Sequence, residues 1–149
     1  MEKKMIRAAS ETYKTNSATI RIDEEGILCV HIHENAEVDE KEVQACFNIY
    51  RQLGCEEDKV LELIFGSNDF TLTKEGSDLA AKHGKDFFIA CALITTNLAV
   101  RLVFNFYTKI QPPDIPFRMF KSEAEARAWL NEFRSDTPPK KSLKKNFLF

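Results

Sequence analysis

Residues 87–95, Phe87-Phe88-Ile89-Ala90-Cys91-Ala92-Leu93-Ile94-Thr95, form the most hydrophobic strand candidate in this 149-residue chain. A second continuous apolar run, Val60-Leu61-Glu62-Leu63-Ile64-Phe65, precedes it. Short continuous runs of this kind are typical of central strands that helices cover. The longest uninterrupted run, residues 87–94, is far shorter than the roughly 18 residues that a membrane-spanning helix needs. The sequence therefore predicts buried strands and no transmembrane segment.

Helical patterns lie between and around these strands. The predicted helices, each with a residue suited to cap its first turn, are 39–53 with Asp39, 73–83 with Thr73, 97–110 with Asn97 and 122–133 with Ser122. The remaining predicted strands are 18–23 and 27–32, joined as a hairpin, and 117–121. The order β-β-α-β-α-β-α-β-α predicts one α/β layered domain with a mixed, mostly parallel sheet flanked by helices.

Charge and composition divide the chain into three parts: a loose N-terminal arm over residues 1–17, the α/β domain over 18–134 and a basic tail over 135–149. The net charge is −2, but both ends are basic, so the central domain is acidic. An acidic surface repels phosphate backbones, and we expect no nucleic-acid partner. The tail has four lysines and an aromatic end, which favours weak contact with an anionic membrane. The alternatives are a solubilising tail or one that folds back onto the domain.

The cysteines and the known catalytic motifs give no support for an enzyme. The four cysteines form no C-x-x-C pair, and no Walker, G-x-S-x-G or G-x-G-x-x-G sequence occurs. We therefore predict no catalytic residues, no metal and no cofactor. Because the chain lacks a signal-peptide pattern, we expect a cytoplasmic protein with reduced thiols. Cys55, in a polar loop, is predicted to be the most exposed thiol.

The end of the domain resembles a known family. Residues 117–120, Phe-Arg-Met-Phe, and residues 122–130, Ser-Glu-Ala-Glu-Ala-Arg-Ala-Trp-Leu, resemble the closing strand and helix of the STAS superfamily. The similarity is greatest to its anti-sigma-factor-antagonist-like branch, which borders the CRAL-TRIO lipid-binding fold. Residues 87–116 and the element order over 18–133 fit the same pattern. The resemblance implies a small regulatory or binding domain rather than an enzyme.

The resemblance also implies a regulatory site. Antagonists of this branch bind a kinase-like partner and are switched by phosphorylation of a serine, usually within Asp-Ser-Ser-Gly, at the start of the helix after the third strand. The corresponding stretch here is Thr71-Leu72-Thr73-Lys74, which lacks that sequence. Only Thr71, Thr73 and the nearby Ser67 carry over as candidate phosphorylation sites. The alternative for hydroxyls at a helix start is capping of the first turn.

The helix over residues 97–110 is the most informative surface. Its polar residues Arg101, Asn105, Thr108 and Lys109 share an arc of about 100°, while its apolar residues span about 200°. An ordinary sheet contact covers little more than 100°, so something else must cover the excess. The candidates are a neighbouring part of the domain, a second copy of the chain, another protein or an acyl chain. The predicted interaction or ligand surface is Val100, Val103, Phe104, Phe106 and Tyr107.

Two functional hypotheses follow. The first is a non-enzymatic regulatory domain that acts through contact with a protein partner or a second copy of itself. The second is the binding or sensing of a small apolar, lipid-like ligand in a cleft beside the helix over residues 97–110.

Overall fold

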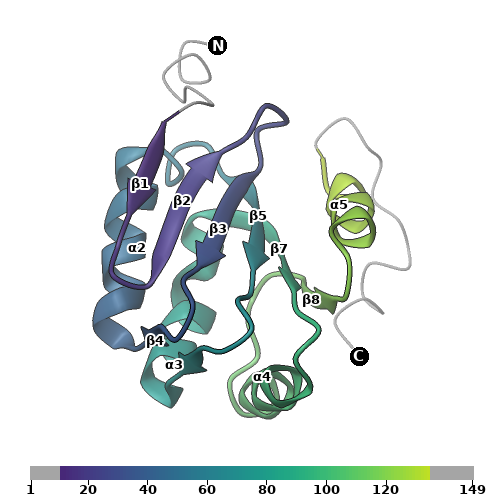
Figure 1. The fold of residues 1–149 in the computed structure, drawn as a ribbon. Coiled ribbons are helices and arrows are strands. Elements are labelled where there is room, and N and C mark those ends of the chain that lie inside the picture. Colours follow the sequence, from purple (N-terminus) through teal and green to yellow (C-terminus); the bar gives the residue numbers. More distant parts are fainter. Residues whose placement is uncertain (1–10, 135–149) are drawn as a thin grey trace.

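The computed structural model describes residues 11–134. Six strands form one sheet in the order β1-β2-β3-β5-β7-β8 (Figure 1). These strands are β1 (Thr12–Lys14), β2 (Ala18–Ile22), β3 (Leu28–Ile32), β5 (Val60–Phe65), β7 (Phe88–Ile94) and β8 (Phe117–Phe120). The first three pair antiparallel, and β3, β5, β7 and β8 pair parallel. The predicted α/β fold with a mixed, mostly parallel sheet is therefore confirmed.

Within residues 11–134, three α-helices connect strands and a fourth follows the last strand. They are α2 (Glu40–Gln52), α3 (Lys74–His83), α4 (Leu98–Ile110) and α5 (Glu123–Asn131), and a short 3-10 helix η1 (Gly84–Asp86) follows α3. Two two-residue strands, β4 (Glu37–Val38) and β6 (Thr71–Leu72), form a separate parallel pair that the sequence did not predict. In the part of the chain that the structure describes, no helix has both the length and the hydropathy needed to cross a membrane.

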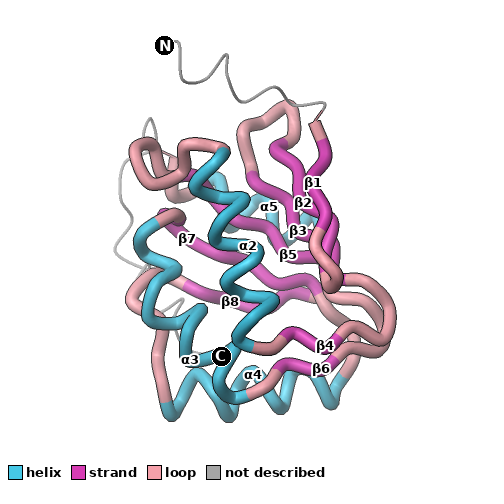
Figure 2. Tube along the Cα trace, turned by 90° about the vertical axis from the view of Figure 1, so that its left-hand side faces the viewer, coloured by secondary structure: helices cyan, strands magenta, loops and turns pink. Residues whose placement is uncertain are grey.

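Helices cover the two faces of the sheet unequally. In Figure 2, α2 and α3 lie in front of the sheet and α5 lies behind it, while α4 runs below the strands. The larger hydrophobic cluster fills the α2 side, and a smaller cluster, which includes Trp129 and Leu130 of α5, fills the other. Because both faces are covered, Cys29 of β3 is only 1% exposed.

Part of the segment predicted to be a loose N-terminal arm is a strand. Thr12–Lys14 forms the edge strand β1, which pairs antiparallel with β2. The ring of Tyr13 packs against the larger hydrophobic cluster, which explains why so polar a segment joins the sheet. The prediction of a loose arm is thus wrong for these residues. Residues 1–10 and the predicted basic tail, 135–149, lie outside the described residues.

The turn that ends α2 corrects the prediction for Cys55. Gly54 adopts a positive φ of 78°, which reverses the chain after the helix. The N–H groups of Gly54 and Cys55 then donate to the carbonyls of Arg51 and Tyr50, the pattern of a Schellman cap. This turn folds Cys55 back beneath the helix, where it is 0% exposed instead of being an accessible thiol.

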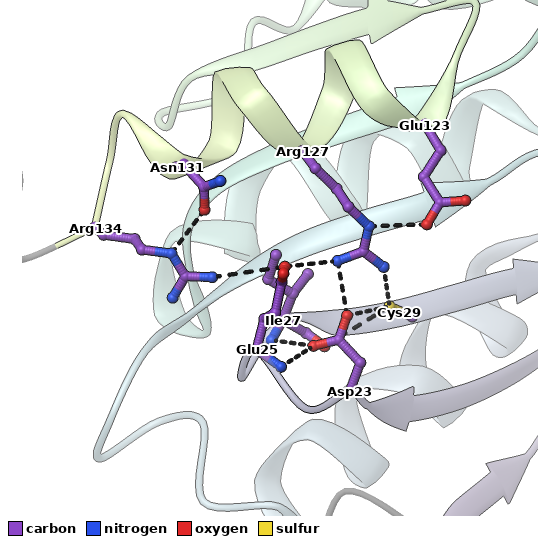
Figure 3. A network of polar contacts seen from close by, with 8 residues as sticks. All are labelled: Asp23, Glu25, Ile27, Cys29, Glu123, Arg127, Asn131 and Arg134. Atoms are coloured by element: carbon purple, nitrogen blue, oxygen red, sulfur yellow. Dashed lines mark hydrogen bonds and ion pairs between the residues drawn. The ribbon is translucent and has the colours of Figure 1, made fainter.

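An ion-pair network holds α5 against the turn of the β2–β3 hairpin (Figure 3). The guanidinium of Arg127 contacts Asp23 at 2.8 Å, Glu25 at 3.0 Å and Glu123 at 2.8 Å. Burial alone would raise the pKa of Asp23, but the N–H of Ile27 and the charge and hydrogen bond of Arg127 lower it below its ordinary value. The network lies on the α5 side of the sheet and has a structural role.

Candidate functional site

A cavity of about 170 Å³ lies on the opposite side of the sheet from α5. Its walls come from five strands of the main sheet and from α2, α3 and α4. Most of the lining is apolar and includes Val43, Phe47, Phe88, Phe104 and Ile115. A dry apolar cavity of about 150 Å³ can hold a benzene molecule, so this space has room for a small ring or a short alkyl chain.

The sequence of α3 explains why space remains there. The residues that α3 and its C-cap turn toward the cavity are all small: Ser77, Ala80, Ala81 and Gly84. Their spacing of i, i+3, i+4 and i+7 places them on one helix face. On α2 the equivalent face carries the large residues Val43, Phe47 and Tyr50, which fill their side of the core. The cavity therefore opens along the small-residue face of α3.

One carboxyl group lies on the sheet wall of this cavity. Glu62, in the centre of β5, is 8% exposed and lines the space. The hydroxyl of Tyr50 donates to Glu62 Oε2 over a long distance of 3.4 Å. Burial raises the pKa of Glu62 to about 7, although hydrogen bonds from the Cys91 thiol and the Tyr50 hydroxyl act in the opposite direction. A group that stays partly protonated at neutral pH is thus placed against an apolar space.

Burial makes the two thiols near Glu62, Cys46 and Cys91, unreactive. Burial raises the pKa of Cys46 to about 12 and, together with the charge of Glu62, holds the pKa of Cys91 well above its ordinary value. Both thiols therefore stay protonated near neutral pH and act as weak hydrogen-bond donors. Sequence reasoning did not single out Glu62, Tyr50, Cys46 or Cys91. The available signal was a single charged residue within the apolar run of β5.

The structure divides the surface predicted on α4. Val100 is 7% exposed, and Phe104 lines the cavity, where its ring stacks 5.9 Å from that of Phe117. Val103 and Phe106 instead face outward, 39% and 60% exposed, and Tyr107 is half-buried. The five predicted residues do not share one surface.

The polar arc of α4 does not simply face solvent. Thr108 of that arc lines the cavity beside Phe104, while several large apolar residues lie on the outside. The outermost are Leu98, Leu102, Phe106 and Ile110, between 51% and 68% exposed. In the described part of the chain nothing buries this outer face. The excess apolar arc that the sequence predicted is thus present, and it points away from the sheet.

The predicted regulatory hydroxyls lie outside the cavity lining. Thr73 caps α3, its Oγ1 accepting a hydrogen bond of 3.0 Å from the N–H of Gly76. Ser67 Oγ donates to the carbonyl of His33 at 3.0 Å. Thr71, in β6, is exposed. Phosphorylation at these residues stays a prediction, and Thr71 has the most accessible hydroxyl of the three.

No group of three or more metal-ligating side chains occurs within residues 11–134. The two strand histidines, at positions i and i+2, make separate contacts. The ring of His31 stacks on Phe65 with centroids 4.2 Å apart, and His33 Nε2 lies 2.8 Å from the Thr19 hydroxyl.

Comparisons with known proteins agree with this architecture. A family model, the domain of unknown function DUF7793, matches residues 20–134. A search of curated protein sequences gave no match. Among solved structures, an uncharacterised protein of the DUF3478 family from Shewanella loihica PV-4, described as having a SpoIIAA-like fold, is similar with a TM-score of 0.55 at 16% identity. That match covers 81% of this chain and 99% of the other. The chain therefore belongs to the DUF7793 family and has a SpoIIAA-like, STAS-like fold.

Proposed function

We propose that this STAS-like domain is a non-enzymatic binding module that takes a small apolar ligand into the cavity between the sheet, α3 and α4. The observation that carries the proposal is the cavity itself, a mostly apolar space of about 170 Å³ with one charged wall residue, Glu62. Small-molecule sites are typically concave and apolar with a few placed polar groups.

The energetic cost of the space supports a binding role. The apolar side chains around this partly open space lack packing partners on one side and so forfeit dispersion contacts. Larger side chains at the small positions of α3 would remove much of that cost. A bound ligand restores the missing contacts and stabilises the folded state by mass action.

The test is binding of toluene, followed by calorimetry and by the shift in Tm. Wild-type protein is expected to bind toluene and to melt at higher temperature as the toluene concentration rises. Ala81→Leu fills the cavity from α3 and should abolish binding. Ala128→Leu makes the same change on the exposed surface of α5 and should leave binding intact. Failure of the wild type to bind, or equal binding by Ala81→Leu, would contradict the proposal.

The outer face of α4 favours a second role, regulation through protein contact. Leu98, Leu102, Phe106 and Ile110 form an exposed apolar strip of the kind found at protein interfaces. A second copy of the chain is the partner that can be tested directly. Sedimentation equilibrium should give a dimer for the wild type and for Lys82→Glu on α3, and a monomer for Phe106→Glu. A monomeric wild type would refute self-association through this face.

Thr71 is the best-placed hydroxyl for control of such contacts. It is exposed, whereas Thr73 is committed to the cap of α3. Phosphorylation of Thr71 adds a dianion to the exposed surface of β6 and leaves the Thr73 cap of α3 in place. Thr71→Glu should therefore alter partner binding while the melting temperature stays close to that of Thr71→Gln. Identical partner binding by the two variants would contradict a charge-based switch.

A further inference from the structure

Glu62 is the one charged side chain among the residues that line the cavity. Its neighbours there are weak hydrogen-bond donors: the Tyr50 hydroxyl at 3.4 Å and the Cys91 thiol. None of the ion pairs found within residues 11–134 involves Glu62, and no Lys, Arg or His contributes to its pKa shift. Within residues 11–134 the carboxyl group thus lies at an apolar wall with no cation beside it.

The position of Glu62 makes this arrangement costly. It lies in the middle of β5, between the neighbouring strands β3 and β7, opposite Leu28 and Cys91. A leucine or valine would suit that environment better, because burial of a carboxyl group without a strong partner is unfavourable. A ligand that enters the cavity would supply the partner that residues 11–134 lack.

We infer that the cavity selects ligands that combine a small apolar body with a protonated amine, which donates a charge-assisted hydrogen bond to the carboxylate of Glu62. The inference rests on the proposed function, since it assigns the ligand class for the same cavity. The apolar body replaces the contacts missing along α3, and the ammonium replaces the missing cation at the sheet wall. Charge-assisted bonds are about twice as strong as neutral ones, and they are strengthened where water is excluded.

Proton linkage gives this selectivity a defined pH dependence. The titratable groups that face Glu62 are Tyr50 and Cys46 on α2 and Cys91 on β7. The pKa of each is raised above its ordinary value, so Glu62 is the group among them that titrates near neutral pH. Below its pKa of about 7 the carboxyl group becomes neutral and loses its attraction for a cation. Affinity for an amine should therefore fall by more than about tenfold between pH 7.5 and pH 5.5.

The experiment compares three probes of similar shape, namely benzylamine, benzyl alcohol and toluene. Calorimetry on the full chain at pH 7.5 is expected to give benzylamine at least about tenfold higher affinity than either neutral probe. Glu62→Gln preserves the shape of the side chain but removes its charge, so it should lose this preference and still bind toluene. Glu57→Gln, which neutralises an exposed carboxylate, is the matched control and should keep the preference.

The outcomes separate this inference from the proposed function. If toluene binds but benzylamine gains nothing over it, the assignment of an amine ligand is overturned while the cavity remains a binding site. If benzyl alcohol binds best and its affinity rises at low pH, Glu62 acts as a neutral donor, and the amine assignment is again overturned. If no probe binds, both fail. The pH dependence in the wild type decides the matter even if Glu62→Gln does not fold.

Discussion

At the scale of single residues, two carboxyl groups of this domain respond to burial in opposite ways. Asp23 is buried beside Arg127 and ionises more readily than usual, whereas Glu62 is buried with no cation from residues 11–134 beside it and stays protonated to a higher pH. Both effects follow from the same balance between desolvation and partners. The first group joins two parts of the fold, and the second is available to a ligand.

The raised pKa of Glu62 predicts that the free energy of unfolding changes with pH. Its folded pKa of about 7 exceeds the ordinary value of 4.5, so the folded state binds more protons between those values. The free energy of unfolding should therefore fall as pH rises through that window, by about 3 kcal/mol from this group. Urea unfolding of wild type and Glu62→Gln at pH 5 and pH 8 isolates this contribution. The variant should gain that amount relative to wild type at pH 8, and a difference that does not change with pH would count against the assignment.

Loss of the Arg127 ion pairs is expected to lower the free energy of unfolding more than loss of an exposed ion pair. Arg127→Met keeps the apolar stem but leaves Asp23, whose side chain is 4% exposed, without its cation. We expect a loss of about 2 kcal/mol in the free energy of unfolding. The lowered pKa of Asp23 adds stability above its unfolded pKa that disappears as pH falls, so the loss should shrink in acid.

The control for Arg127 is Arg51→Met. Arg51 pairs with Glu56, and the two side chains are 45% and 43% exposed. Loss of this ion pair should lower the free energy of unfolding by less than about 1 kcal/mol. Chemical unfolding of both variants at pH 7 makes the comparison. Equal losses would mean that the network in Figure 3 does not hold α5 in place.

At the scale of elements, local signals in the sequence predict the helices and the longer strands. Asp39, Thr73, Asn97 and Ser122 each cap the helix that they were expected to begin. The strand β5 has the predicted bounds. The short strands β1, β4 and β6 were missed, because a strand of two or three residues has too few positions to show alternation and depends on its partner strand.

The first turn of α3 is packed too closely for a side chain at Gly76. A Cβ atom there would lie 2.8 Å from the carbonyl oxygen of Val38, a backbone atom that cannot move aside freely. Gly76→Ala should therefore lower the free energy of unfolding by about 1–3 kcal/mol, although alanine is the better helix former. Chemical unfolding measures the loss, and Ser77→Ala in the same turn is the control. A Gly76→Ala variant as stable as wild type would show that this contact is looser than described.

At the scale of the whole molecule, the two faces of the sheet have different tasks. The α5 face is closed by Trp129, Leu130 and the Arg127 network, and it stabilises the fold. The face beneath α2 and α3 contains the cavity. Figures 1 and 2 show α4 at the edge of that face. If the cavity binds a ligand as proposed, the Arg127 ion pairs lie on the opposite face of the sheet and are not in its way.

The candidate site could be predicted only in part. The sequence indicated that residues 97–110 carry more apolar surface than one sheet contact needs, and Phe104 does reach the cavity. It could not show that the same helix turns its most apolar edge outward, because helical periodicity fixes relative angles but not which side meets the sheet. The cavity itself arises where strands of both sheets meet α2, α3 and α4, and no local sequence pattern encodes that arrangement.

A crystal structure of the protein under xenon pressure tests the ligand-binding cavity most directly. Xenon enters apolar cavities of this size without needing polar contacts. A xenon site is expected beside Ala81, Phe88 and Phe104 in the wild type, and it should be absent in Ala81→Leu. A wild-type crystal with no xenon there, or with side chains filling the space, would contradict a ligand-binding cavity in this fold.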